Sequence, residues 1–225
     1  MTPSNYPKDS FHNDVELFID KEIIAQEENV FHSCHSPLPR EIVWQSKTPW
    51  EGITSTYFSV IQDDDNVRLY YRGGQDDITC IMESKDGINF SRPELGLIDF
   101  QGSKKNNIVY SGPESHNFAP FIDANPLALP EQRYKCLAGY PYLFALASPD
   151  GIHWHRLKEE PVLKEGAFDS HNVAFFDKEQ EVYRSYSRLW TNEDGSIHKI
   201  GGGEIGTGVR GIQSCVSDDF LRWGR

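Results

Sequence analysis

A seven-residue pattern that occurs twice, and a third time in looser form, constrains the fold of this chain more than any other feature. Ser-Pro-Asp-Gly-Ile-His-Trp spans residues 148–154, Ser-Lys-Asp-Gly-Ile-Asn-Phe spans 84–90, and Ser-Asp-Asp-Phe-Leu-Arg-Trp spans 217–223. An Asp-Gly or Asp-Asp pair makes a tight turn, and the Ser and Asp side chains can bond the turn's own backbone N–H groups. Because similarity at a near-regular spacing marks a repeat architecture, we expect one structural unit copied along the chain.

Each copy of the turn follows the third of three apolar segments that come in the same order. Inner strands are expected at 57–61, 118–122 and 173–176, second strands at 67–72, 134–139 and 182–188, and third strands at 78–83, 142–147 and 211–216. Fourth strands are expected near 107–110 and 161–163. No window of useful length shows helical periodicity. The pattern therefore predicts an all-β chain made of four-stranded antiparallel β-propeller blades, with an antiparallel sandwich as the alternative.

The predicted domain organisation is a loose N-terminal tail followed by one propeller domain. The tail covers residues 1–15 and the propeller 16–225, with blades at approximately 50–112, 113–164 and 165–225. Propellers close with about four to eight blades, and this chain shows about three. An open stack of three exposes two sheet faces, so we expect either a fragment of a longer reading frame or closure by self-association.

Charge and composition exclude several classes of partner. The formal net charge is −12 and the densest basic spot is the pair Lys104-Lys105, so no nucleic-acid partner is expected. No apolar run approaches the ~20 residues of a membrane span. The four cysteines form no Cys-x-x-Cys motif, and we predict no metal or other cofactor. The N-terminus lacks the apolar core of a signal peptide. The expected location is cytoplasmic, or outside the cell if an N-terminal signal has been lost by truncation.

With these residues in hand, the chain resembles the five-bladed β-propeller superfamily of glycoside hydrolases, which includes arabinanases, xylosidases, invertases and levansucrases. It is most similar to a poorly characterised bacterial branch of that superfamily. Besides the Ser-x-Asp-Gly-Ile-x-Trp turns, the stretches that carry the resemblance are Glu-Leu-Phe-Ile-Asp at 16–20, Pro-Trp-Glu-Gly at 49–52, Leu-Tyr-Tyr-Arg-Gly at 69–73, Gly-Ser-Lys-Lys-Asn-Asn-Ile-Val at 102–109 and Phe-Asp-Ser-His-Asn-Val at 168–173. The resemblance covers nearly the whole chain from residue 16.

Glycoside hydrolysis needs two carboxyl groups that face each other across a sugar. In a propeller the residues just before each inner strand form the rim of a central funnel, and a carboxylate stands there in every unit: Glu51, Glu114 and Asp169. The resemblance implies one acidic residue from each of the first three blades, acting as base or nucleophile, pKa modulator and acid. Asp20 is a fourth candidate, reaching the funnel from the N-terminal strand. For each of these residues a structural turn or loop carboxylate is the alternative.

Polar residues repeat beside these carboxylates and are the expected carbohydrate contacts. His116-Asn117 and His171-Asn172 occupy equivalent positions, and Arg72 and Arg188 are each the last residue of a tyrosine-bearing second strand. Histidine and asparagine can bond sugar hydroxyls, while the arginines could bind an anionic sugar or pair with a rim acid.

The predicted function is cleavage of a glycosidic bond. The chain departs from the family at the inner strand of unit one, where residues 53–57 carry no aspartate, and in unit three, where Asp169 stands in place of a glutamate. The alternatives are therefore a non-catalytic propeller that binds carbohydrate or protein, and an inactive truncated fragment.

Overall fold

The computed structural model of the chain describes residues 21, 24–53, 56–74, 77–192, 194–196 and 208–224. The chain divides into two units, Met1–Arg40 and Glu41–Arg225. In the described part of the first unit there is no strand or helix, and Glu27 pairs with Lys21 at 2.7 Å and with His32 at 3.0 Å. The strand expected at 16–20, together with Asp20, lies outside the described residues.

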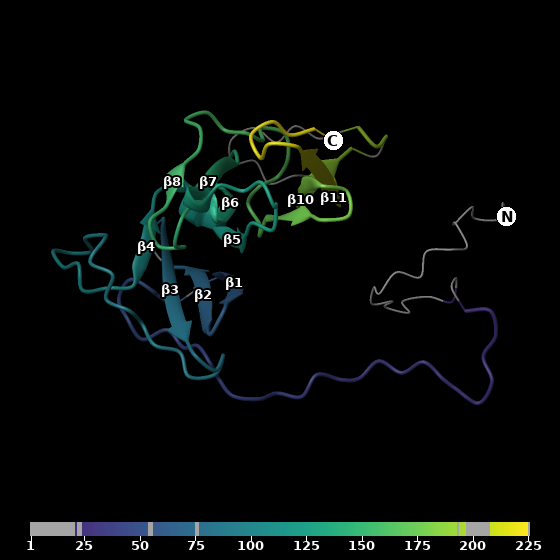
Figure 1. Cartoon of the computed structure of the whole chain (residues 1–225), viewed down its shortest axis with the longest axis horizontal. Coiled ribbons are helices and arrows are strands. Elements are labelled where there is room, and N and C mark those ends of the chain that lie inside the picture. Colours follow the sequence, from purple (N-terminus) through teal and green to yellow (C-terminus); the bar gives the residue numbers. More distant parts are fainter. Residues whose placement is uncertain are drawn as a thin grey trace. The chain divides into compact units, whose positions relative to one another are not determined.

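The second unit holds three antiparallel sheets, each built from consecutive strands (Figure 1). The first contains β1 (Thr56–Asp63), β2 (Asn66–Arg72), β3 (Ile78–Ser84) and β4 (Ile108–Ser111). The second contains β5 (Ala119–Ile122), β6 (Tyr134–Ala138), β7 (Phe144–Ser148) and β8 (His155–Arg156). The third contains β9 (Val173–Asp177), β10 (Val182–Thr191) and β11 (Val209–Ser217). Two short 3-10 helices, η1 (Pro113–Asn117) and η2 (Pro130–Gln132), flank β5.

The prediction of an all-β chain with propeller-type blades is confirmed, with three differences in detail. The fourth strand of the second sheet is β8 rather than 161–163, because Leu163 makes only an isolated bridge to Leu143. The third sheet has three strands among the described residues, and Gly224 bridges to Val216 where a fourth would begin. Strand β10 continues past Arg188, because its ladder with β11 runs to the pair Thr191–Val209.

The sheets lie side by side through their first strands, as blades around a shared axis do. Strand β5 contacts both β1 and β9, and β6 also contacts β9. The starts of β1, β5 and β9 lie near one another, because Tyr57 in β1 contacts both His116 just before β5 and His171 just before β9. We call these starts the rim and the opposite ends, at Asp63, Asp123 and Asp177, the far end.

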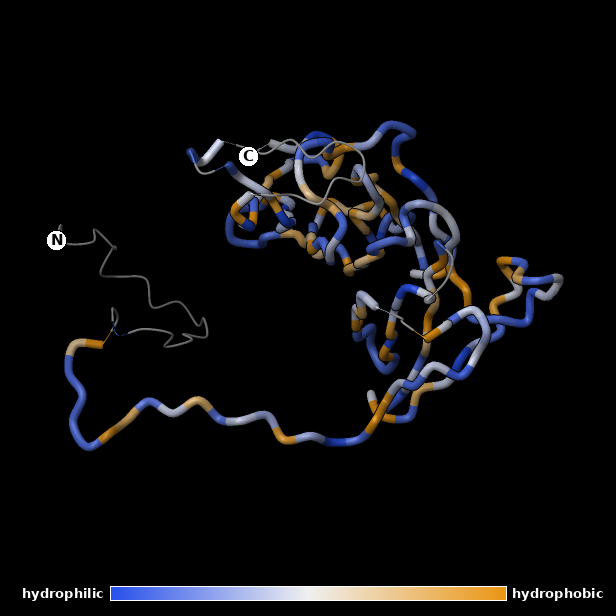
Figure 2. The backbone as a smooth tube through the Cα atoms, turned by 180° about the vertical axis from the view of Figure 1, so that it is seen from behind, coloured by the Kyte–Doolittle hydropathy of each residue, from blue (hydrophilic) through white to orange (hydrophobic). Residues whose placement is uncertain are grey.

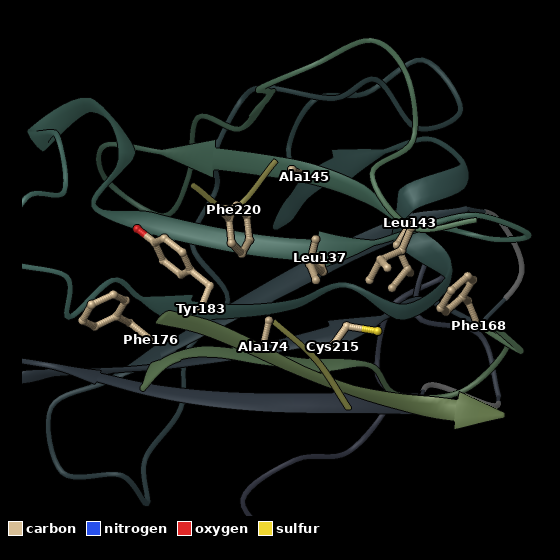
Figure 3. Close-up of a cluster of buried hydrophobic side chains, with 10 residues drawn as sticks. Leu137, Leu143, Ala145, Phe168, Ala174, Phe176, Tyr183, Cys215 and Phe220 are labelled. Atoms are coloured by element: carbon tan, nitrogen blue, oxygen red, sulfur yellow. The ribbon is translucent and has the colours of Figure 1, made fainter. Parts of the chain in front are cut away.

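Apolar side chains fill the spaces between the sheets, and Figure 2 shows apolar and hydrophilic stretches alternating along the backbone of the second unit. Between the second and third sheets, Leu137 and Leu143 face Ala174, Phe176 and Cys215 (Figure 3). Between the first and second, a further cluster forms from all four strands of the first sheet and the first residue of β6: Ile61, Tyr70, Ile81, Val109 and Tyr134. Each buried large side chain contributes about 1.5–3 kcal/mol to stability, so these interfaces hold the blades together.

The three Ser-x-Asp turns share one hydrogen-bond pattern. In the second copy the Oγ of Ser148 accepts from the backbone N–H of Gly151 at 2.9 Å, and Oδ1 of Asp150 accepts from the N–H of Ile152 at 2.8 Å. The first copy makes the equivalent bonds at 3.0 Å and 2.9 Å. In the third copy the residue at the Gly position is Phe220, which adopts a φ of 65°. The turns are therefore structural, as expected.

At the far end the inner strands are tied to the next sheet by charged and hydroxyl groups. Asp63 accepts hydrogen bonds from Arg133 and from the hydroxyl of Tyr134. In the next sheet Asp123 accepts from Lys135 at 2.6 Å and from the hydroxyl of Tyr183 at 2.7 Å. These aspartates were expected to form turns, and Asp123 does bond the N–H of Asn125, but both also join neighbouring blades.

Candidate functional site

Tyr57 stands at the centre of the rim and contacts both of the other sheets. Its hydroxyl donates to the backbone carbonyl of Asp169 at 2.8 Å, and its ring lies 6.0 Å from the rings of both His116 and His171, centroid to centroid. The residue has a φ of 58° and sits where the β1–β2 register shifts between Thr56 and Ser59. Such an irregularity redirects a side chain, and backbone strain of this kind concentrates at functional sites.

Arg72 connects the first sheet to the second. It is the last residue of β2, and one of its Nη atoms donates to Nδ1 of His116 at 3.2 Å and to the carbonyl of His116 at 3.3 Å. The guanidinium also lies 5.3 Å from the centroid of the Tyr57 ring, a cation–π distance. Because a guanidinium can only donate, His116 accepts through Nδ1 and is therefore neutral in this arrangement.

The third sheet contributes Asp169, His171 and Arg188. Asp169 is ion-paired with Arg188, and its side chain retains 44% of its solvent exposure. Nε2 of His171 lies 3.3 Å from the hydroxyl of Ser59 on β1. We refer to the six residues that converge here as the rim cluster: Tyr57, Arg72, His116, Asp169, His171 and Arg188.

The two histidines of the rim cluster are held in their neutral form by their surroundings. Burial and the nearby positive charge of Arg72 lower the pKa of His116, while the backbone carbonyl of Asp169 and the charges of Asp77 and Asp169 partly oppose that shift. Burial lowers the pKa of His171. Near neutral pH both rings can therefore accept and donate hydrogen bonds as neutral imidazoles.

Glu51 is fully buried and belongs to a different group of residues. Its carboxylate accepts from Nε of Arg92 at 2.6 Å, from the backbone N–H of Lys47 at 2.8 Å and from the hydroxyl of Tyr71 at 2.5 Å. Burial alone would raise the pKa of Glu51, but the bonds from Arg92, Lys47 and Tyr71 lower it below its ordinary value. These bonds tie the segment before β1 to the first sheet.

Glu114 lies in η1, two residues before His116, and its side chain points into the protein. It is 1% exposed, bonds Nε of Arg156 at 2.5 Å and accepts from the hydroxyl of Tyr110 at 3.2 Å. The structure therefore does not bring Glu51 or Glu114 to the rim cluster, and Asp169 is the candidate acid that it does bring there.

Asn117 and Asn172 are buried and bond the backbone around the rim. Asn117 accepts from the N–H of Gly139 at 2.7 Å and donates to the carbonyl of Phe168, to which Asn172 also donates at 3.3 Å. Their side chains position the loops that carry His116 and His171.

Three rim residues were not among the sequence-predicted contacts. Tyr57 and Ser59 belong to β1, and the ring of Tyr140 stacks on His116 with centroids 5.2 Å apart. Tyr57 could have been predicted from its position. It lies at the start of an inner strand, and the two histidines lie just before the other two inner strands. No sequence signal marks Tyr140, because it reaches the rim from the β6–β7 connection.

A cleft with a volume of about 580 Å³ opens beside the rim cluster on the outward face of the third sheet. His171 and Arg188 line it together with Val173, Tyr186 and Ile212. Among the residues that the structure describes, no three His, Cys, Asp or Glu side chains gather in a way that could hold a metal ion. No helix in the same part of the chain is long and apolar enough to cross a membrane.

No protein-family model and no curated protein matches the chain. Among solved structures, it is similar to a thermostable family-43 glycoside hydrolase, with 14% identity and a TM-score of 0.47 over 79% of this chain and 53% of that chain. A glycosyl hydrolase from Bacteroides ovatus gives 15% identity and a TM-score of 0.45 over 77% and 51%. A structure of the GH130 family of mannoside phosphorylases gives 13% and 0.44 over 76% and 50%.

The chain thus spans about half the length of these structures.

Proposed function

We propose that the rim cluster binds carbohydrate. The observation that carries this proposal is the meeting of three sheets at Tyr57, where neutral imidazoles, guanidinium groups and aromatic rings lie within bonding reach of one another. Sugars offer hydroxyl groups that need both donors and acceptors, and neutral histidines supply both. The rings of Tyr57 and Tyr140 offer apolar faces beside those polar groups.

A second candidate function is hydrolysis of the bound glycan, with Asp169 as the catalytic carboxylate. Its support is the partial exposure of Asp169 at the start of β9, whereas Glu51 and Glu114 are buried and paired. A hydrolase of this type uses two carboxyl groups, and Asp169 is the one carboxylate of the rim cluster. Carbohydrate binding is therefore the better supported function, and hydrolysis additionally needs a second acid.

Binding and hydrolysis can be separated with two variants. A panel of pentose and hexose oligosaccharides would be tested by calorimetry for binding and by release of reducing ends for cleavage. Tyr57→Ala should weaken binding roughly 3- to 10-fold, the effect of removing one aromatic contact. Asp169→Asn should leave binding within a small factor and, if the chain is a hydrolase, lower kcat by about 100-fold or more.

The matched control is Asp65→Asn, an exposed aspartate in the β1–β2 turn at the far end. It should change neither binding nor cleavage. Full binding by the Tyr57→Ala variant, with its thermal unfolding unchanged, would show that the carbohydrate site lies elsewhere. Unaltered cleavage by Asp169→Asn would remove Asp169 from the mechanism.

A further inference from the structure

The arginines of this chain differ sharply in how their charge is balanced. Within the described residues, the other half-buried arginines each pair with a carboxylate, and they are Arg68, Arg92, Arg133, Arg156, Arg184 and Arg188. Arg72 is half-buried too, yet among those residues no carboxylate lies within 4.0 Å of its guanidinium. Its partners are a neutral imidazole, a backbone carbonyl and the face of Tyr57.

A half-buried guanidinium without a counter-ion costs free energy that a bound anion can offset. Asp169, the carboxylate of the rim cluster, is already paired with Arg188. Asp77 is near enough to raise the pKa of His116 but makes no ion pair with Arg72. The rim cluster therefore carries two guanidinium groups and one carboxylate. It has an excess of positive charge, although the formal net charge of the whole chain is −12.

The guanidinium of Arg72 also has the right chemistry for a planar anion. One Nη atom is engaged by His116, and the group can present its remaining N–H donors to two oxygens of a carboxylate. The rings of Tyr57 and His116 lie directly beside it, so a sugar ring could contact them while its charged substituent meets Arg72.

We propose that Arg72 is the anion-binding residue of the rim cluster, and that the carbohydrate it selects carries a carboxylate, as hexuronic acids do. This inference rests on the proposed carbohydrate function and names the class of sugar. His116 acts as a positioning residue, since its Nδ1 and its carbonyl orient the Arg72 guanidinium.

The test compares acidic oligosaccharides with the same molecules after methyl esterification, which removes the charge and keeps the sugar. Oligomers of galacturonate, glucuronate and mannuronate would each be titrated calorimetrically against the full chain. A charge-assisted bond should make the acid bind at least about tenfold more tightly than its ester. The preference should shrink as salt rises, because screening weakens interactions between exposed charges.

Arg72→Gln should abolish the preference for the acid, whereas Arg72→Lys should retain part of it. Lys178→Gln removes an equal charge from the exposed turn after β9 and should leave the preference intact. Thermal unfolding of each variant shows that it is folded.

Three outcomes contradict the proposals in distinguishable ways. Equal binding of acid and ester overturns the anion assignment and leaves carbohydrate binding standing. A preference for the acid that survives in Arg72→Gln overturns the role of Arg72. Binding of neither form, while neutral oligosaccharides also fail to bind, overturns carbohydrate binding at the rim and this inference with it.

Discussion

The two ends of the inner strands use charged residues for opposite purposes. At the far end, Asp63 is saturated by Arg133 and the hydroxyl of Tyr134 from the following sheet. Asp123 is saturated by Lys135 of its own sheet and the hydroxyl of Tyr183 from the following sheet. At the rim, Arg72 has no carboxylate partner among the described residues, and two histidines stay neutral. A saturated charge holds blades together, and an unsaturated one remains available to a ligand. The contrast separates the polar groups that join blades from the rim groups that we propose bind a ligand.

The far-end pattern also reveals a regularity between blades. The strand pairing places Tyr134 opposite Ser148 and Tyr183 opposite Ser217, while the same position opposite Ser84 holds Val67. The two tyrosines bond the aspartate of the preceding blade, and the first sheet has no blade before it among those described. A tyrosine thus occupies this position in the two sheets that follow another blade, and a valine occupies it in the first sheet.

The largest effect should come from breaking the far-end ion pair of the second sheet, Lys135 with Asp123, both of which bond the hydroxyl of Tyr183 from the third sheet. The Lys135 side chain is 5% exposed and that of Asp123 is fully buried, with Nζ and a carboxylate oxygen 2.6 Å apart. Lys135→Met leaves a buried carboxylate without its cation, and this should lower the free energy of unfolding by about 3–5 kcal/mol. Chemical denaturation of the wild-type and variant proteins measures this difference in the free energy of unfolding.

Arg72→Gln is the matched rim substitution, and the same denaturation experiment should show a much smaller loss of stability. If the Arg72 and Lys135 variants were destabilised equally, the distinction between a structural far end and a functional rim would be lost.

A smaller effect should separate the two Asp-Gly turns at the far end. Both Gly87 and Gly151 have positive φ, at 71° and 75°, so alanine at either site should cost about 1–2 kcal/mol. A Cβ at Gly151 would also lie 2.6 Å from the hydroxyl oxygen of Tyr70, whereas at Gly87 its nearest neighbour is 4.0 Å away. Gly151→Ala should therefore shift the thermal midpoint clearly more than Gly87→Ala. Equal shifts would mean that the second turn does not pack against the first sheet as described.

The smallest effect concerns the rim histidines and pH. Their pKa values are lowered in the folded protein, so between the folded and the ordinary unfolded value of about 6.5 the unfolded chain binds more protons. Their contribution to stability is therefore present above the unfolded pKa and is lost as the pH falls from 7 towards 5. Replacing both His116 and His171 with Gln should flatten this part of the stability curve, measured by denaturation at a series of pH values. If the free energy of unfolding of the double variant fell with pH as steeply as that of the wild type, other titratable groups would cause the pH dependence.

Local rules were enough to predict the strands and turns. The Ser-x-Asp turns bond their own backbone, and the alternating apolar segments mark β-strands, so both follow from nearest neighbours in sequence. The fourth strand of the second sheet was misplaced because β8 is only two residues long and its pairing with β7 depends on contacts that no local pattern encodes.

The candidate site could be predicted only in part, for the same reason. Asp169, His171, Arg188, His116 and Arg72 were found because they stand at equivalent positions before inner strands or in second strands. Glu51 and Glu114 satisfied the same positional rule, yet half-buried arginine partners distant in sequence hold them inside the protein.

The sequence by itself therefore determined which segments become strands, where the chain turns, and that the inner strands begin at polar segments. These properties depend on backbone hydrogen bonding and on apolar alternation over a few residues. Only the tertiary structure decided which polar side chains face one another across three sheets, and which charges are balanced. The contacts that decide this include Arg92 with Glu51, 41 positions apart, and Tyr57 with Asp169, 112 positions apart. Their proximity exists only once the blades are packed.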